Sequence, residues 1–215
     1  LSNNDSGTSN TIFGKSAGAS LDAGSNYNVF IGEAVSDATM NDATNNVGVG
    51  YQALSALTTG DYNTAVGGGA LLVNLSGEVN VAIGANAMQA NTASQNTAVG
   101  GNALYANVDG ENNVAVGHNA LDANVSGDLN VAVGKDALGA YVGNAAVAVG
   151  REALRDLNHA DALGTVGIGQ GAGAALTSGT ANVAIGYQAL TADVLGDEST
   201  AVGYQALDSQ TGTDG

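Results

Sequence analysis

The sequence predicts an all-β protein, a parallel β-solenoid (β-roll) of about twelve coils with about 17 residues in each coil. A short unit, Asn-(Val/Thr)-Ala-(Val/Ile)-Gly, recurs along the whole chain with small changes. The glycines that close its copies are 16 to 19 residues apart. Proline is absent, as expected where inter-strand ladders need every backbone N–H. The closing glycines are Gly14, Gly32, Gly50, Gly67, Gly84, Gly100, Gly117, Gly134, Gly150, Gly169, Gly186 and Gly203.

The period excludes the common helical repeats. Those hold two helices and a turn in roughly 33 to 47 residues, whereas one coil of a β-solenoid fits the spacing seen here. Residues 1–215 are therefore interpreted as one repeat array. Leu1 and Gly7 fall inside a repeat and Gly215 falls on a repeat boundary, so we expect a segment of a longer fibre, because solenoids need capped ends.

Each unit opens with a short strand. In Val114-Ala115-Val116 the branched residues face one side and Ala115 faces the other, because side chains alternate along a strand. That second side is Ala or Gly in ten of the twelve copies, which predicts close approach of another backbone. Gly117 then allows a positive φ or a tight corner.

A second apolar anchor and a turn complete the coil. Leu121 and Leu138 belong to an Ala-Leu pair that follows the glycine, and residues 126–128 (Ser-Gly-Asp) are a turn signal. One turn of helix over the Ala-Leu stretch is the alternative. No long helix fits between the glycines.

Asparagine opens nine of the twelve copies. In stacked coils these amides would form a ladder with a spacing of about 4.8 Å, and a ligand-binding row is the alternative. The predicted ladder residues are Asn46, Asn63, Asn80, Asn96, Asn113, Asn130 and Asn182, preceded by Asn10 and Asn28.

The rhythm is irregular in two places. The first two copies carry Ile12-Phe13 and Phe30-Ile31 in place of Ala-Val, which predicts a wider coil there. The interval also stretches to 19 residues across residues 151–164, so two extra residues should bulge outward. Length variation in solenoids usually lies on one face, often the binding face.

Composition limits the partners. The net charge is −16, from four Lys and Arg against twenty Asp and Glu, so nucleic acid is not an expected partner, because phosphate binding needs clustered cations. No apolar run approaches the length of about 18 residues of a transmembrane helix, so no membrane insertion is expected. Cysteine is absent, which excludes disulfides and thiolate chemistry.

The Asn-x-Ala-(Val/Ile)-Gly unit resembles the head repeats of trimeric autotransporter adhesins. The longer form, with Gly-Tyr-Gln-Ala-Leu at residues 50–54, 186–190 and 203–207, looks more like the repeats of phage tail fibres and related bacterial fibre proteins. The resemblance covers nearly the whole chain. It implies a homotrimeric fibre outside the cell, on a cell surface or on a virion surface.

Catalysis is not expected. His118 occupies a slot that elsewhere holds Tyr51, Lys135 or Arg151, so this slot is interpreted as solvent-facing. His159, near Arg155 and Asp161, is the only mixed polar cluster and is interpreted as a surface loop. We find no nucleophilic triad order, phosphate loop or helical pair of histidines.

Acidic residues recur after the turn glycine and are weak candidates for metal binding. Carboxylates stacked at about 4.8 Å either repel each other or share a hard cation such as Ca²⁺. The sequence lacks the Gly-Gly-x-Gly-x-Asp pattern of calcium-binding solenoids, and no cofactor is predicted. The candidates are Asp61, Glu78, Glu111, Asp128 and Asp197.

Tyr51, Tyr187 and Tyr204 share one position of the coil and are candidates for contact with a glycan or another receptor, because exposed tyrosine can stack on sugar rings. Packing at a seam between chains is the alternative.

The expected function is that of a structural or adhesive fibre segment for surface attachment. Small coils with Ala on one strand face enclose little core, so we expect a parallel homotrimer that buries either the Ala or the Val/Ile face. A Ca²⁺-dependent extracellular binding module is the alternative. A polysaccharide-cleaving solenoid enzyme would need clustered acids, and the acids here are scattered.

Overall fold

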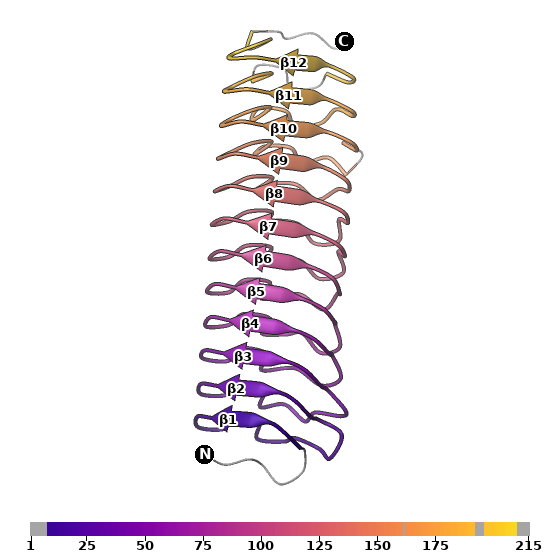
Figure 1. Ribbon diagram of the computed structural model, residues 1–215. Helices are drawn as coiled ribbons and strands as arrows, with labels where there is room; N and C mark the ends of the chain where they lie inside the picture. Colours follow the sequence, from indigo (N-terminus) through magenta and orange to yellow (C-terminus); the bar gives the residue numbers. More distant parts are fainter. Residues whose placement is uncertain (1–7, 161, 192–195, 210–215) are drawn as a thin grey trace. The chain divides into compact units, whose positions relative to one another are not determined.

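A computed structural model describes residues 8–160, 162–191 and 196–209. Its contacts divide the chain into two compact units, residues 1–109 and 110–215, and each unit is described by itself. Both contain short parallel strands, one per coil (Figure 1). The strands of the first unit are β1 (Thr11–Phe13), β2 (Val29–Ile31), β3 (Val47–Val49), β4 (Thr64–Val66), β5 (Val81–Ile83) and β6 (Thr97–Val99). Those of the second are β7 (Val114–Val116), β8 (Val131–Val133), β9 (Val147–Val149), β10 (Val166–Ile168), β11 (Val183–Ile185) and β12 (Thr200–Val202).

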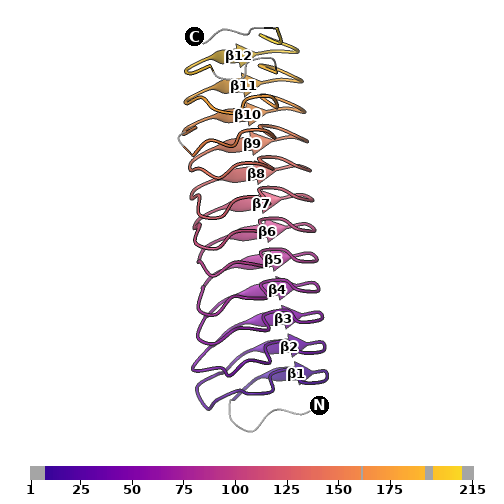
Figure 2. The same cartoon turned by 180° about the vertical axis from the view of Figure 1, so that it is seen from behind.

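The strands of each unit pair in chain order and in register. In the second unit Val114 lies opposite Val131, and Ala115 opposite Ala132. Behind the strands, each coil returns through turns (Figure 2). The predicted all-β parallel solenoid with coils of about 17 residues is thereby confirmed. The described residues contain no helix, so the helical alternative for the Ala-Leu stretch is wrong.

The central residue of every strand points into the coil. Ala115 and Ala132 are fully buried, whereas the flanking valines of β7 and β8 are partly exposed. The narrow side predicted from the alanines is therefore the interior of the coil. Of the two faces considered for burial between chains, the Ala face is already used, and the Val/Ile face points outward.

The corner glycines have the backbone conformation that the sequence predicts. Their φ angles lie between +127° and +139°, a region that disfavours residues with a Cβ atom. A Cβ atom on Gly134 would also lie only 2.5 Å from the carbonyl carbon and oxygen of Gly150 in the next coil. The coils can stack this closely only because glycine follows each strand.

After the corner, every second residue has a positive φ. Gln52 and Leu54 have φ angles of 56° and 55°. Their N–H groups donate to Glu33 O and Ala70 O, which lie in neighbouring coils on opposite sides. The inter-coil bonds hold conformations that cost free energy in non-glycine residues, and Leu54 is buried as the predicted second anchor.

The first coils hold larger side chains at the central strand position. Ile12 and Phe30 are buried where later coils have Ala. The next strand compensates, since Gly48 lies opposite Phe30 in the register. A Cβ atom on Gly48 would meet Val35 Cγ1 at 2.6 Å and Phe30 Cδ1 at 3.3 Å.

The long coil after β9 carries an exposed segment. Asn158, His159 and Ala160 are exposed, between Leu157 and Ala162, which are buried. Asp161, like Leu1, Gly7 and Gly215, lies outside the described residues. Nowhere in the described ranges does the chain form an apolar helix of membrane-spanning length.

Candidate functional site

The asparagines that open the repeats lie inside the coils and link them. Asn46 illustrates the pattern: its Oδ1 accepts the Asn63 N–H at 2.9 Å, and its Nδ2 donates to Gly60 O at 2.9 Å, both in the next coil. Asn63 Nδ2 adds a side-chain bond to Asn46 Oδ1 at 3.1 Å. The buried members of this column are Asn28, Asn46, Asn63, Asn80, Asn96, Asn113, Asn130 and Asn182, with Asn10 nearly buried.

A second asparagine column was not singled out in the sequence. Asn74, Asn91, Asn107 and Asn124 are fully buried three residues after the Leu or Met anchor. Asn124 bonds both the N–H and the C=O of Gly127, and so closes its own turn. Other coils place an apolar residue here, such as Leu57. That variation hid the column, although the recurrence of Asn in four successive coils was a usable signal.

Tyr141 occupies this second column where the first column lacks asparagine. Ala146 stands where other coils have the first-column asparagine. An asparagine at this position would donate its amide N–H to the turn carbonyl of the next coil, Ala162 O. The Tyr141 hydroxyl lies 3.2 Å from that oxygen and 2.8 Å from Asn144 O, and it donates to one of the two. Burial raises the pKa of Tyr141 to about 12. Among the described residues, every buried side-chain polar atom has a hydrogen-bond partner.

The three aspartates among the acidic metal candidates accept hydrogen bonds from the backbone of the preceding coil. Asp61 Oδ1 accepts the Thr44 N–H, Asp128 Oδ1 the Glu111 N–H and Asp197 Oδ1 the Thr180 N–H, at 2.6 to 2.7 Å. Glu78 differs, because its backbone N–H donates to Ser94 Oγ in the next coil at 3.0 Å. These contacts give the three aspartates a role in turn geometry. No group of three or more metal-ligating side chains occurs within the described ranges.

The three candidate receptor tyrosines are exposed at the position after the corner glycine. Tyr51 is 59% exposed, Tyr187 40% and Tyr204 73%. Tyr187 and Tyr204 lie in successive coils and stack with their ring centroids 5.4 Å apart and an angle of 9° between the rings. Gln205 Nε2 donates to Gln188 Oε1 beside them at 3.2 Å.

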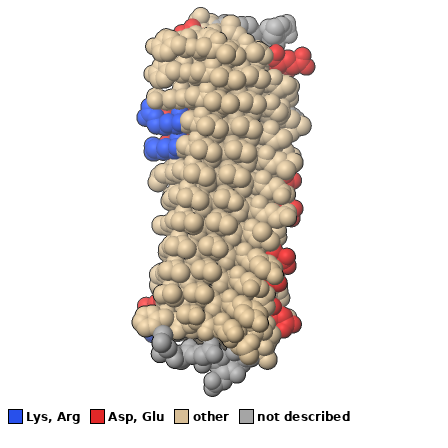
Figure 3. Space-filling model, viewed as in Figure 1, with Lys and Arg blue, Asp and Glu red and all other residues tan. Residues whose placement is uncertain are grey.

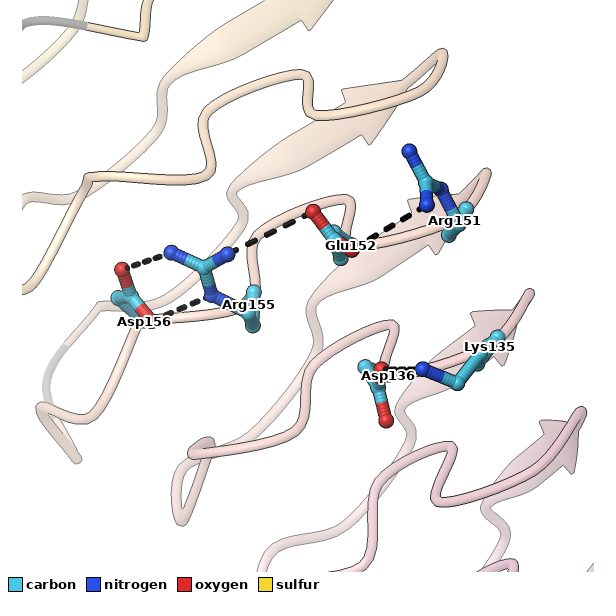
Figure 4. Close-up of polar contacts among 6 residues, drawn as sticks. All are labelled: Lys135, Asp136, Arg151, Glu152, Arg155 and Asp156. Atoms are coloured by element: carbon cyan, nitrogen blue, oxygen red, sulfur yellow. Dashed lines mark hydrogen bonds and ion pairs between the residues drawn. The ribbon is translucent and has the colours of Figure 1, made fainter.

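The strongest concentration of charge in the second unit follows β8 and β9. Lys135 pairs with Asp136 at 2.8 Å and Arg155 with Asp156 at 2.7 Å. Arg155 and Arg151 both contact Glu152, at 3.5 and 3.7 Å. Figure 4 shows Lys135 and Arg151 at the corners that follow the strands. Arg155 and Asp156 lie farther along the coil, on the returning stretch, by which we mean the turns that lead from the corner back toward the next strand.

The electrostatics of this cluster are those of exposed ion pairs. The hydrogen bond from Lys135 lowers the pKa of Asp136, and the one from Arg155 lowers the pKa of Asp156. Burial raises the pKa of nearby Asp122. His118 is exposed one coil before Lys135, and His159 is exposed in the long coil. The two histidines lie in different coils, and the structure does not bring them together into a shared site.

The strands present a uniform surface, the outer strand face, which we define as the outward side chains of the first and third residues of each strand. Every such residue in the described strands is Val, Ile, Thr or Phe. Val66, Ile83, Ile168 and Ile185 are 36 to 40% exposed. In Figure 3 the middle of the view is uncharged, Lys and Arg gather at its left beside a few acids, and most of the visible acids lie at its right.

No protein-family model, curated protein or solved structure matches this chain. The resemblance to fibre repeats therefore remains a prediction.

Proposed function

We propose that this chain is a segment of an extracellular structural fibre that assembles as a parallel homotrimer through the outer strand face and serves in surface attachment. One observation carries the proposal: a continuous row of uncharged side chains, β-branched except for Phe13, points outward in each unit. Monomeric soluble proteins rarely expose large contiguous apolar patches, and such patches usually mark interaction sites. The cell surface or a virion surface is the corresponding location.

The interior of the coils supports a structural role. Its column of Ala and Gly leaves little apolar volume, and its polar columns connect each coil with the next. A coil so thin gains further buried area when its outer face is covered by another chain, at about 25 cal/mol per Å². This proposal includes no catalytic role.

Attachment would use side chains outside the outer strand face. The stacked pair Tyr187 and Tyr204 is the best-formed candidate, because its rings are held parallel and exposed. A cell-surface glycan is the partner that fits flat, exposed tyrosine rings with neighbouring amides. Loss of binding to glycan-coated surfaces in Tyr204→Ala, with the oligomer intact, would support this contact.

The assembly is tested by placing a charge on the outer strand face. Val133→Lys and Ile185→Lys should each convert an oligomer of three times the 20.8 kDa chain mass into monomers, as measured by sedimentation equilibrium. Val125→Lys is the matched control, because Val125 is 47% exposed in a turn. A wild-type chain that is folded and monomeric at high concentration would refute the proposal.

A further inference from the structure

Tyr187 and Tyr204 are the one pair of tyrosines in this chain that occupy the same position in neighbouring coils. Each follows the corner glycine after its strand, β11 or β12. Their rings are parallel to within 9°, with centroids 5.4 Å apart. Aromatic side chains are in contact at centroid distances of about 4.5 to 7 Å. Because both rings are also exposed, they are in contact with each other and open to reagents in solution.

The backbone holds the two tyrosines side by side. On one side of Tyr204, Gly203 N–H donates to Ile185 O at 2.8 Å. On the other side, Gln205 N–H donates to Tyr187 O at 2.9 Å. Holding two reactive groups together in this way makes their reaction effectively unimolecular. The exposed side chains can still change rotamer within nanoseconds, so the edges of the two rings can meet.

The other tyrosines of the chain, all of which lie in the described residues, do not form such a pair. Tyr51 shares the coil position, but the adjacent coils carry Glu33 and Gly68 there. Tyr27 and Tyr62 share another position, and one whole coil lies between them. The remaining two occupy positions that hold tyrosine in a single coil. The paired arrangement is therefore specific to the coils of β11 and β12.

We infer that Tyr187 and Tyr204 are a site of oxidative cross-linking, at which a haem peroxidase with hydrogen peroxide joins them as dityrosine. Each phenol loses one electron and one proton, and the two phenoxyl radicals combine in a C–C bond between ring carbons ortho to the oxygens. The protons on these carbons then move to the oxygens and restore both phenols. Hydrogen peroxide takes up the two electrons and two protons and becomes two molecules of water.

The cross-link ties the coil of β11 covalently to that of β12. It closes a loop of 17 residues (204 − 187). Disulfides stabilise folds mainly by restricting the unfolded chain, and a dityrosine bond does the same in a chain that has no cysteine. Both tyrosines belong to one chain, so the cross-link forms whether or not the proposed trimer does.

Oxidation of the full chain at low protein concentration, with peroxidase and hydrogen peroxide, tests the site. A protease that cleaves after acidic residues separates Tyr187 from Tyr204 at Asp197 and Glu198, unless a cross-link joins the two peptides. Mass spectrometry should find the joined peptide, lighter by two hydrogens than the sum of its parts. On a denaturing gel the oxidised chain should keep the mobility of the 20.8 kDa monomer, because the bond lies within one chain.

Two variants assign the cross-link to this pair. Tyr204→Phe keeps an aromatic ring but removes the phenol, so it should abolish the joined peptide. Tyr51→Phe is the matched control, because Tyr51 occupies the same coil position without a tyrosine in either adjacent coil, and it should leave the joined peptide unchanged. A wild-type chain whose tyrosines are oxidised without a joined peptide, or are joined only between chains as a dimer band, would overturn the inference.

Gly68 allows the same pair to be built next to Tyr51. A Cβ atom on Gly68 would have only Tyr51 O within 4 Å, at 3.9 Å, and the φ angle of Gly68 is not positive, so a side chain fits there. Gly68→Tyr places a second ring beside Tyr51, and oxidation should join residues 51 and 68 across the cleavage site at Asp61. Oxidation of both rings without a link would show that adjacency at this coil position does not suffice, which contradicts the basis of the cross-linking site.

Discussion

The coils that carry β2 and β7 share a three-residue strand and a corner glycine but have different interiors. Phe30 fills the centre of β2, and Ala115 fills the centre of β7. The difference is absorbed by the neighbouring coil, where Gly48 takes the place of Ala. The same exchange occurs at Leu154, which occupies the space of a Cβ atom on Gly167. Side-chain volume is therefore balanced between adjacent coils, while the corners and inter-coil hydrogen bonds stay unchanged.

Removing the large residue should break this balance most strongly. Phe30→Ala is expected to lower the free energy of unfolding by about 3–5 kcal/mol, because Gly48 cannot fill the cavity. Chemical denaturation measures the change. Tyr27→Ala in the same coil removes an exposed ring and should cost much less, and equal losses would contradict the volume exchange.

The corner that both regions share is the next target. Gly134→Ala should cost about 2–4 kcal/mol, because its Cβ atom would meet the Gly150 carbonyl at a positive φ. Gly139→Ala, in the same coil, should change the unfolding free energy by less than about 0.5 kcal/mol, since its nearest contact would be 3.5 Å away. Tolerance of Gly134→Ala would show that the stacking can relax.

A smaller loss of stability is expected where Tyr141 takes over from the missing first-column asparagine. Tyr141→Phe should cost about 1–3 kcal/mol, because a buried carbonyl loses its donor. Tyrosine ionises near pH 10 in the unfolded chain and at about 12 in the fold. The stability contributed by neutral Tyr141 is thus complete below pH 10 and is lost between about pH 10 and 12. Denaturation across this range should show that slope in the wild type and lose it in the variant.

The smallest expected effect concerns the acidic turns. Chelation with EDTA should shift the melting temperature by less than about 1 °C, because Asp61, Asp128 and Asp197 accept backbone N–H groups. Thermal unfolding with EDTA and with added Ca²⁺ provides the measurement. A large drop on chelation would instead favour the Ca²⁺-dependent alternative.

Much of the fold could be predicted because its constraints repeat. The glycine spacing, the branched residues of Val114 and Val116 and the small residue between them required one strand and one corner per coil. The sequence left open whether the Ala or the Val/Ile face would be buried between chains, since a period of two does not tell inside from outside. The structure shows that Ala115 lies inside its own coil, so the Val/Ile face is the outward one.

The returning stretch and the sites were harder to predict. The left-handed conformations of Gln52 and Leu54 come from hydrogen bonds to both neighbouring coils, and neither residue type indicates them. The second asparagine column spans only four successive coils, between Leu57 and Tyr141, so it is a weaker signal in the repeat than the first column. The hydrogen bond from Glu111 N–H to Asp128 joins residues 17 positions apart in the sequence. It depends on how the coils stack, and the type of residue at either position does not indicate it.

The hydrogen bonds between coils have a mechanical consequence. At the strands, the corners and the turns, backbone N–H groups of one coil donate to carbonyl groups of an adjacent coil, so these bonds lie along the stacking direction. We expect a load applied along the stacking direction to break these bonds one coil at a time. Within each unit every such step would release about 17 residues, roughly 60 Å of contour length. The fold would then lengthen under tension by discrete, nearly equal increments.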